Sequence, residues 1–246
     1  MKAVLNTQQT ETLQNLLGQG FEIQAPMSKY TTAHVGGPAE AVCIAKNSND
    51  LEKVCSLLWQ WQIPFRMLGR GSNVLVSDKG MKEVVVINRA NNIEFTEDKQ
   101  SPSVMAESGL NLSGLARLAA EKGFSGLEWA VSVPGTVGGA IFGNAGAHGS
   151  DMEDNLKLAE ILHPIYGKKV YHTADLQYMY RSSVFKRTNE PVVILNAVFH
   201  LENSTQQEVE DRMASFAQHR KNTQPPGASL GSMFRNPDDT SAGELI

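Results

Sequence analysis

A glycine-rich stretch in the middle of the chain limits most strongly how this protein can fold. Residues 135 to 149 contain six glycines, interleaved with small apolar residues and few charges. A flexible linker would instead be polar and rich in serine. Because this stretch is apolar enough to be buried, its glycines predict a loop whose backbone approaches a flat or phosphorylated ligand closely. The alternative is a packing device that contacts no ligand.

A second glycine-containing segment, Gly69-Arg70-Gly71-Ser72-Asn73-Val74, follows an expected strand at 65–68. It is similar to the start of a dinucleotide-binding fingerprint, but a valine occupies the place of the third glycine and an extended run follows. A Rossmann site is therefore excluded. The turn still exposes successive backbone N–H groups, a hydroxyl and an amide, which suit phosphate oxygens. Taken alone, it predicts a tight hairpin at least as well as a ligand loop.

Hydrophobic periodicity predicts helices and strands in irregular order, which favours an α+β fold over a regular doubly wound sheet. Either Ser48 or Asn49 is expected to cap the second helix. Helices are expected at 6–18, 48–61, 111–122 and 206–221, and strands at 40–46, 65–68, 74–76, 84–87, near 93, 104, 158 and 170, and at 192–201. The last residues, 243–246, read like the first turn of a further helix.

Composition excludes several classes of protein. The formal net charge is −4, so the chain has no overall electrostatic basis for binding DNA or RNA. No run of about 18 apolar residues predicts a membrane span, and the polar start lacks the pattern of a secretory signal. Cys43 and Cys55 lie among apolar residues without metal-ligand spacing, so they are expected to be buried free thiols. The six histidines also lack metal-ligand spacing. With neither a membrane span nor a secretory signal predicted, the expected location is the cytoplasm.

Six short segments, in order along residues 30–240, resemble those of the UDP-N-acetylenolpyruvoylglucosamine reductase family of flavoenzymes, which act in bacterial cell-wall precursor synthesis. The segments are residues 31–39, 68–75, 133–139, 143–147, 180–186 and 231–237. Their common order is far more specific than any one of them. Their spacing is similar to that of the shorter variety of the family, which lacks an extra substrate-covering loop.

The resemblance implies an FAD-binding fold of the vanillyl-alcohol-oxidase type, with two α+β subdomains at 1–90 and 91–203 and the start of a substrate-binding domain at 204–246. Two glycine-containing loops would hold the FAD diphosphate, and neither is expected to front a helix. Asn144 would lie beside the flavin. The implied cofactor-binding residues are Gly69, Arg70, Gly71, Ser72, Asn73, Pro134, Gly135, Thr136, Gly138, Gly139 and Asn144.

The resemblance also implies the reaction. NADPH would donate a hydride through FAD to the enolpyruvyl ether of UDP-N-acetylglucosamine, giving UDP-N-acetylmuramate. Arg181 resembles the family's enolate-stabilising arginine, and its guanidinium suits a carboxylate. Ser232 resembles the proton donor, and Tyr180 and Asn236 are the implied substrate-binding residues. Without the surrounding motifs, Arg181 would be interpreted as a surface ion-pair residue and Ser232 as a turn residue. No metal is implied, and a monomer is expected.

One departure from the family pattern affects the expected activity. The family has a catalytic glutamate in a C-terminal Leu-Glu-x-Glu-Val segment, which these 246 residues do not contain, and Glu244 does not match it. We therefore expect a C-terminally truncated member. Two alternatives stay open: a catalytically impaired or inactive FAD-binding remnant, or a related flavin oxidase acting on an alcohol or lactone. In an oxidase, the segments around Arg181 and Ser232 would have no role.

Overall fold

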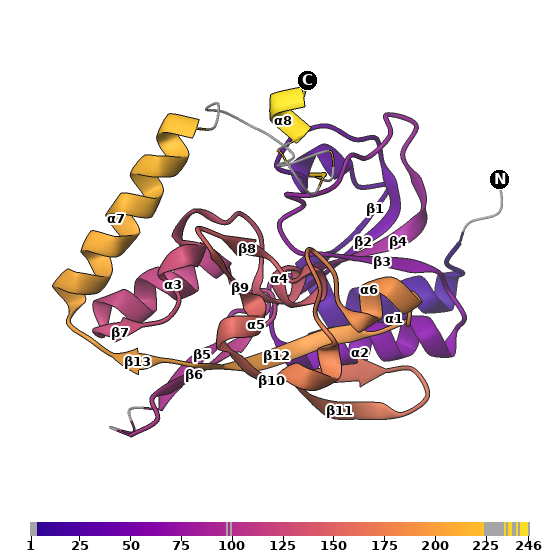
Figure 1. The fold of residues 1–246 in the computed structure, drawn as a ribbon. Coiled ribbons are helices and arrows are strands. Elements are labelled where there is room, and N and C mark those ends of the chain that lie inside the picture. The colour runs from indigo at the N-terminus through magenta and orange to yellow at the C-terminus, as the bar shows by residue number, and fades with distance from the viewer. Residues whose placement is uncertain are drawn as a thin grey trace.

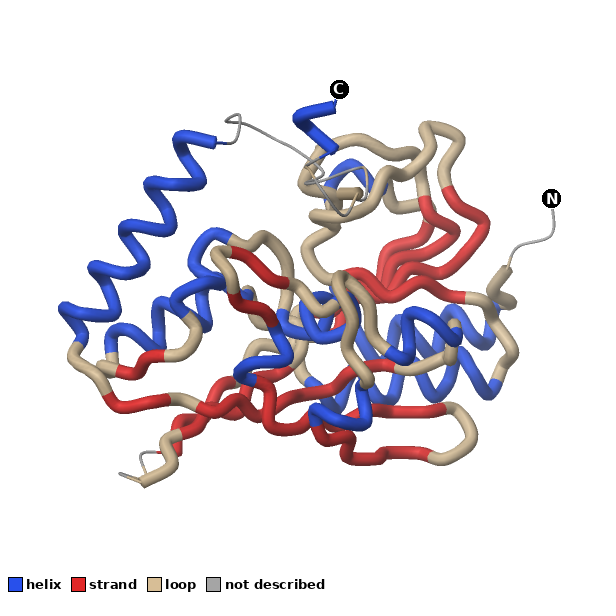
Figure 2. Tube along the Cα trace, in the orientation of Figure 1, coloured by secondary structure: helices blue, strands red, loops and turns tan. Residues whose placement is uncertain are grey.

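The described part of the fold consists of two larger β-sheets, two short two-stranded sheets, and helices between and around the larger pair (Figure 1). The computed structural model describes residues 4–96, 98, 100–223, 234, 236–237, 240 and 242–245. Helices and strands alternate irregularly along the chain, as Figure 2 shows, which confirms the predicted α+β class. No helix among the described residues is long and apolar enough to cross a membrane.

The first sheet has four strands in the order β1-β2-β4-β3. Strand β2 pairs with β4 in parallel, and β3 pairs with β4 in parallel, whereas β1 is antiparallel to β2. The carboxyl ends of β3 and β4 therefore reach the same edge, with Leu68 opposite Ile87. The strands are β1 Phe21–Ile23, β2 Ala39–Ala45, β3 Phe65–Leu68 and β4 Met81–Asn88.

The second sheet has five antiparallel strands in the order β11-β10-β12-β6-β5. Helices α3 and α4 pack on it, and α7 packs outside α3, so that apolar side chains of all three contribute to one core. The strands are β5 Ile93–Thr96, β6 Ser103–Glu107, β10 Leu156–His163, β11 Gly167–His172 and β12 Val193–His200; the helices are α3 Leu112–Glu121, α4 Val137–Gly143 and α7 Gln206–Thr223.

Helices α1 (Thr7–Leu17) and α2 (Ser48–Gln60) lie between the two sheets (Figure 1). Their buried leucines share a core with Leu162, Val193 and Leu195 of the second sheet. The cap of α2 is Asn47, not Ser48 or Asn49 as expected, because the Asn47 side chain accepts a hydrogen bond from the backbone of Asp50.

A buried carboxylate also joins the two parts of the chain. Glu107, at the end of β6, accepts hydrogen bonds of 2.8 Å from the backbone N–H groups of both Ser48 and Asn92. The expected division into domains at 1–90, 91–203 and 204–246 stays a prediction.

The remaining elements are short. They are the 3-10 turns η1 Gly18–Gly20, η2 Met27–Lys29, η3 Glu128–Ser132 and η4 Thr173–Leu176, the strands β7 Phe124–Ser125, β8 Gly146–Ala147, β9 Ser150–Asp151 and β13 Glu202–Asn203, and the helices α5 Met152–Asn155, α6 Val184–Thr188 and α8 Ala242–Leu245. Helix α8 agrees with the helical start predicted at 243–246.

Two expectations about loops are wrong. Residues 74–76 form no strand, because this segment packs across residues 36 and 37, where Gly37 donates to the Ser77 carbonyl. The glycine-rich stretch is not a loop throughout, because α4 begins within it. Thr136 caps this helix through Gly139 N–H, and a side chain on Gly138 would come within 2.9 Å of Ser108 Cβ. Gly138 therefore lets α4 pack closely against Ser108.

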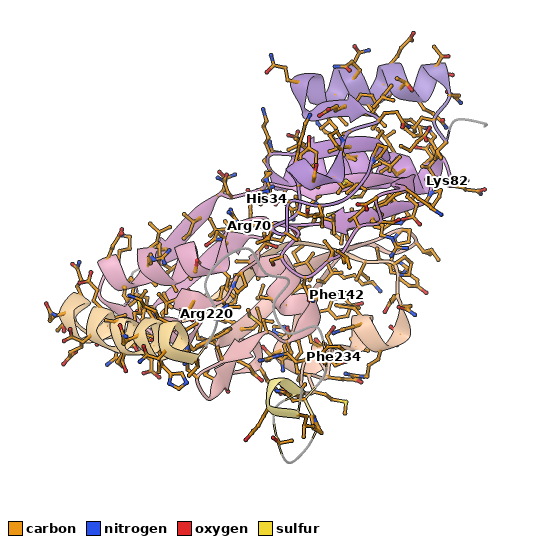
Figure 3. The ribbon with its side chains drawn as sticks, turned by 90° about the horizontal axis from the view of Figure 1, so that it is seen from above. His34, Arg70, Lys82, Phe142, Arg220 and Phe234 are labelled. Carbon is orange, nitrogen blue, oxygen red and sulfur yellow. The ribbon has the colours of Figure 1, made fainter. Side chains whose placement is uncertain are left out.

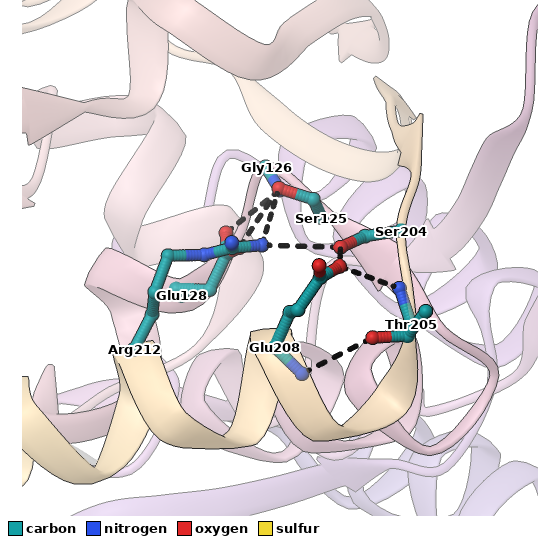
Figure 4. A network of polar contacts seen from close by, with 7 residues as sticks. All are labelled: Ser125, Gly126, Glu128, Ser204, Thr205, Glu208 and Arg212. Atoms are coloured by element: carbon teal, nitrogen blue, oxygen red, sulfur yellow. Dashed lines mark hydrogen bonds and ion pairs between the residues drawn. The ribbon is translucent and has the colours of Figure 1, made fainter.

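A polar network fixes helix α7 to the body of the protein (Figure 4). Arg212 forms an ion pair of 2.8 Å with Glu128 and also donates to Ser125. At the start of the helix, the Glu208 carboxylate accepts from Thr205 N–H while Thr205 Oγ1 accepts from Glu208 N–H, the reciprocal arrangement of a capping box. The network therefore joins the first half of α7 to η3 and β7.

Candidate active site

The two predicted ligand loops lie against each other. The loop 69–73 follows the carboxyl end of β3, and a Cβ placed on Gly69 would overlap the side chain of Thr136. Gly71 has a φ of +63° and lies against the backbone of residues 30 and 31, where a side chain would also clash. Thr32 N–H donates to the Gly71 carbonyl at 3.1 Å. Thr32 Oγ1 donates to the Arg70 carbonyl at 3.3 Å, and Figure 3 labels Arg70 as seen from above.

The two loops differ in how many backbone donors they leave for a ligand. The N–H groups of residues 70 to 73 donate to no acceptor among the described residues, so they can form an anion-binding concavity. In the second loop, Val137 N–H donates to Leu110 O at 2.9 Å and Gly138 N–H to Ser108 O at 2.8 Å. The first loop is therefore the richer source of donors, with Gly135 and Thr136 facing it.

The predicted catalytic arginine lies at the other end of α4. Asn144 ends this helix in the left-handed conformation, and the Arg181 guanidinium donates to its carbonyl at 3.3 Å and to the carbonyl of Gly146. Arg181 itself has a φ of +54° in the turn between Met179 and Ser182. Non-glycine residues in this region cost conformational energy, and such strain concentrates at functional sites.

The Asn144 side chain is buried and only partly satisfied. Its Nδ2 donates to Asp151 Oδ2 at 3.0 Å and to Met179 O at 3.2 Å. Its Oδ1 has no partner, the single case of a buried side-chain polar atom without one among the described residues. Because unpaired buried acceptors are costly, this oxygen is a candidate contact for a bound molecule.

The segment 178–186 is held against α4 by several hydrogen bonds. Tyr178 Oη donates to Ile141 O at 2.9 Å, and Ser183 Oγ donates to Phe142 O at 2.7 Å. Burial, and then the nearby Asp151 and Glu153, raise the pKa of Tyr178, so its hydroxyl stays protonated as a donor. Lys186 Nζ donates to Arg181 O at 2.8 Å and supports the strained turn.

The two predicted substrate-binding residues come together. Asn236 Nδ2 donates to Tyr180 Oη at 3.3 Å, and the Arg181 guanidinium lies 5.0 Å from the centroid of the Tyr180 ring. Ser232 lies outside the described residues, so its predicted role as proton donor stays a prediction. Among the other predicted residues, Ser72 Oγ lies near Gly135, and Asn73 and Pro134 are exposed.

Helix α4 connects the two halves of this site. Its cap Thr136 touches the loop 69–73, and Asn144 at its end touches Arg181. Seven helical residues span about 10 Å. The sequence analysis missed three residues that take part: Arg89, which donates to Gly69 O at 2.9 Å, Asp151 and Lys186. The parallel pairing of β3 and β4, which places Arg89 at the edge of the sheet beside the loop, is known only from the structure.

Comparison with known proteins gives the class first. Residues 39–164 match the family model described as an FAD binding domain. A solvent-stable cholesterol oxidase shares the fold alone, at 13% identity and a TM-score of 0.57 over 74% of this chain and 38% of the oxidase. The chain therefore has an FAD-binding fold of the vanillyl-alcohol-oxidase type, as the sequence predicted.

Closer relatives give the family. The crystal structure of UDP-N-acetylenolpyruvylglucosamine reductase from Thermus caldophilus matches with 31% identity and a TM-score of 0.76, over 92% of this chain and 79% of that one. UDP-N-acetylenolpyruvoylglucosamine reductase 1 of Bacillus cereus is 37% identical over 225 residues, which cover 91% of this chain and 74% of the relative. The Chlamydia pneumoniae reductase is 38% identical over 221 residues, covering 89% and 70%. The chain belongs to the UDP-N-acetylenolpyruvoylglucosamine reductase family.

Proposed function

We propose that this protein reduces the enolpyruvyl ether of UDP-N-acetylglucosamine to UDP-N-acetylmuramate in peptidoglycan precursor synthesis, with FAD as cofactor and NADPH as hydride donor. The names of its relatives support the substrate and the reaction. One observation carries the proposal: α4 joins a loop with free backbone donors to a fixed guanidinium, which suits an extended dinucleotide with its reactive end beside Arg181.

The residues present fit FAD. The free N–H groups of residues 70 to 73 and the Arg70 side chain would hold the diphosphate, with Gly135 and Thr136 opposite. The unpaired Asn144 Oδ1 offers an acceptor at the other end of α4. When bound, FAD supplies hydride transfer between NADPH and the unsaturated ether.

Arg181 would stabilise the negative charge that develops on the enolate and its carboxylate. The Asn144 and Gly146 carbonyls hold two guanidinium nitrogens, and the remaining N–H groups are available for a carboxylate. Tyr180 and Asn236 would orient the substrate from one side. Ser232 would deliver the proton to the carbon next to the carboxylate.

The proposal also includes a monomeric state and a location in the cytoplasm. The buried free thiols Cys43 and Cys55 fit a reducing compartment.

Flavin absorption of the purified full chain tests the proposal. We expect a yellow protein that NADPH bleaches without oxygen and that the UDP-sugar enol ether recolours. Arg181→Met should leave bleaching by NADPH unchanged and slow the recolouring about 10²- to 10³-fold, the usual effect of removing one group that stabilises developing charge. The control is Arg117→Met on the exposed face of α3.

Each other result has its own interpretation. A colourless protein would contradict FAD binding. Bleaching by NADPH without recolouring by the UDP-sugar would instead support a catalytically inactive FAD-binding form. Recolouring only by oxygen, with peroxide formed from an alcohol or lactone, would identify an oxidase.

A further inference from the structure

We propose that Arg89 and Arg70 together form a paired-guanidinium subsite for the diphosphate of a flavin dinucleotide, and that Arg89 makes the protein select FAD over flavins without a diphosphate. This inference rests on the proposed function, since it concerns the same cofactor. Arg89 is not among the residues that the sequence motifs mark.

The two arginines are brought together by parallel pairing. Strand β3 ends at Leu68 and β4 at Asn88, and Leu68 lies opposite Ile87 in the register. Arg70 and Arg89 therefore follow neighbouring parallel strands at the same carboxyl edge, where open sheets of this kind bind ligands. Arg89 Nη1 donates to Gly69 O at 2.9 Å, which places its guanidinium directly against the loop 69–73.

The charges of these two side chains are not compensated by the described part of the protein. Neither guanidinium forms an ion pair there, whereas Arg66 pairs with Glu83 at 2.7 Å and Arg212 pairs with Glu128. Arg89 is half-buried, and burial together with the positive charge of Arg70 lowers its pKa. Two like charges held together at a partly buried site favour binding of an anion with two or more charges.

The donors at this site match a diphosphate in number. Of the five N–H donors of the Arg89 guanidinium, the hydrogen bond to Gly69 O uses one on Nη1, so most remain available. The free N–H groups of residues 70 to 73 line the same loop. A diphosphate offers several acceptor oxygens and at least two negative charges, which can accept from both sets at once.

The backbone of Arg89 is held on both sides, so its side chain starts from a fixed position. Arg89 N–H donates to Ala45 O at 2.7 Å. The neighbouring Asn88 side chain accepts from Ala90 N–H at 3.0 Å and donates to Ser108 Oγ at 2.7 Å, and it is buried. Such an arrangement lowers the ordering cost of binding.

Binding of three ligands to the full chain tests the proposal: FAD, riboflavin and inorganic pyrophosphate, the first two by flavin fluorescence and the third by calorimetry. We expect the wild-type protein to prefer FAD over riboflavin. Arg89→Gln should weaken FAD binding about 10- to 100-fold, since a hydrogen bond to a charged group is lost, and should change riboflavin binding less than about twofold. Arg89→Lys should recover part of the FAD affinity, and its Kd should rise with salt. The control Arg66→Gln should bind all three ligands as the wild type does.

Thermal unfolding of the ligand-free variants separates binding from folding. If Arg89→Gln fails to fold, the binding measurements are made with Arg89→Lys instead. Lysine lacks the bidentate donors of arginine, so this variant should still bind FAD more weakly than the wild type, with little change in riboflavin binding. Equal weakening of FAD and riboflavin, or no weakening of either, would overturn the role of Arg89. If the wild-type protein binds pyrophosphate through Arg89 but no FAD, the subsite stands as an anion site and the FAD-dependent function is refuted.

Discussion

At the residue scale, the site depends on backbone conformations that side chains rarely adopt. Asn144, His148, Gln177 and Arg181 all have positive φ values, and all lie in the turns around the arginine end of the site. Asparagine tolerates this region well, so Asn144 could be suspected from its type, but an arginine there could not. The conformation of Arg181 is fixed by what its guanidinium and its carbonyl contact, namely Gly146, Asn144 and Lys186.

His148 should make the stability of the protein depend on pH. Its ring stacks on Phe216 of α7 with centroids 4.4 Å apart, and its Nε2 lies 3.3 Å from Ser132 Oγ. Burial, followed by the positive charges of His219 and Arg220, lowers the pKa of His148. The unfolded chain therefore binds the proton more readily. The neutral His148 ring contributes fully to the free energy of unfolding above its unfolded-state pKa of about 6.5. This contribution is lost as the pH falls through the lower pKa of the folded state.

The measurement is the free energy of unfolding in urea between pH 7.5 and pH 5. The wild type should lose stability over this range, and His148→Asn, which tolerates the positive φ, should show a flatter pH profile. His200→Asn, at an exposed position of β12, serves as the matched control and should follow the wild type. Identical profiles for His148→Asn and the wild type would refute the assignment.

At the element scale, the polar network at Glu128 determines how firmly α7 is attached. Glu128 is almost fully buried, and Arg212 is half exposed. Burial tends to raise the pKa of Glu128, but hydrogen bonds from its own backbone, Ser125, Gly126 and Arg212 outweigh burial and lower it. We expect Arg212→Met to leave this carboxylate without its cation and to cost about 2 kcal/mol of stability.

Hydrogen exchange locates this effect. In Arg212→Met, the amides of α7 should exchange faster, whereas those of β12 should change little, because α7 can detach before the sheet opens. Lys221→Met, at an exposed position on the same helix, should leave exchange unchanged. Uniformly faster exchange in both elements would mean that the ion pair supports the whole fold and not the helix alone.

Most elements of this fold follow from sequence patterns, and the exceptions have physical reasons. The helices ending at Leu17, Gln60 and Glu121 carry clear apolar periodicity and asparagine caps. Helix α4 has no such signal, because three of its seven residues are glycines, which have low helix propensity. It forms because Thr136 caps it and because β6 and β12 pack against it, contacts that no local pattern contains.

The sequence also predicted most, but not all, of the residues of the candidate active site. The motifs identified both glycine-containing loops and the segment around Arg181, and the structure brings Tyr180, Arg181 and Asn236 together. Arg89 was missed because only the parallel register of β3 and β4 places it beside Arg70. Asp151 was missed because its role depends on the direction of the Asn144 side chain, which spacing along the chain does not determine.

At the scale of the whole molecule, Glu107 links the second sheet to helix α2 and to the segment that connects β4 to β5. Its carboxylate accepts from Ser48 at the start of α2 and from Asn92 before β5. We expect Glu107→Ala to leave both N–H groups without their acceptor and to cost about 2 kcal/mol. Exchange of amides in β4 and β12 should accelerate together, because α2, which Glu107 holds at its start, shares one core with both sheets.

Urea denaturation followed by circular dichroism gives the stability change, and Glu94→Ala at an exposed position of β5 is the control. Faster exchange in β12 alone would show that the first sheet does not depend on this carboxylate. An unchanged midpoint for Glu107→Ala would show that solvent replaces both hydrogen bonds at no cost.

The position of α4 has a consequence for how such a site can vary. A helix turns by about 100° per residue, so adding or removing one residue between Thr136 and Asn144 would rotate one end of the site relative to the other. A change in the length of α4 would therefore alter both ends of the site at once. The length of α4 thus fixes the distance and the relative rotation between Thr136 and Asn144. Insertions elsewhere on the surface leave both unchanged.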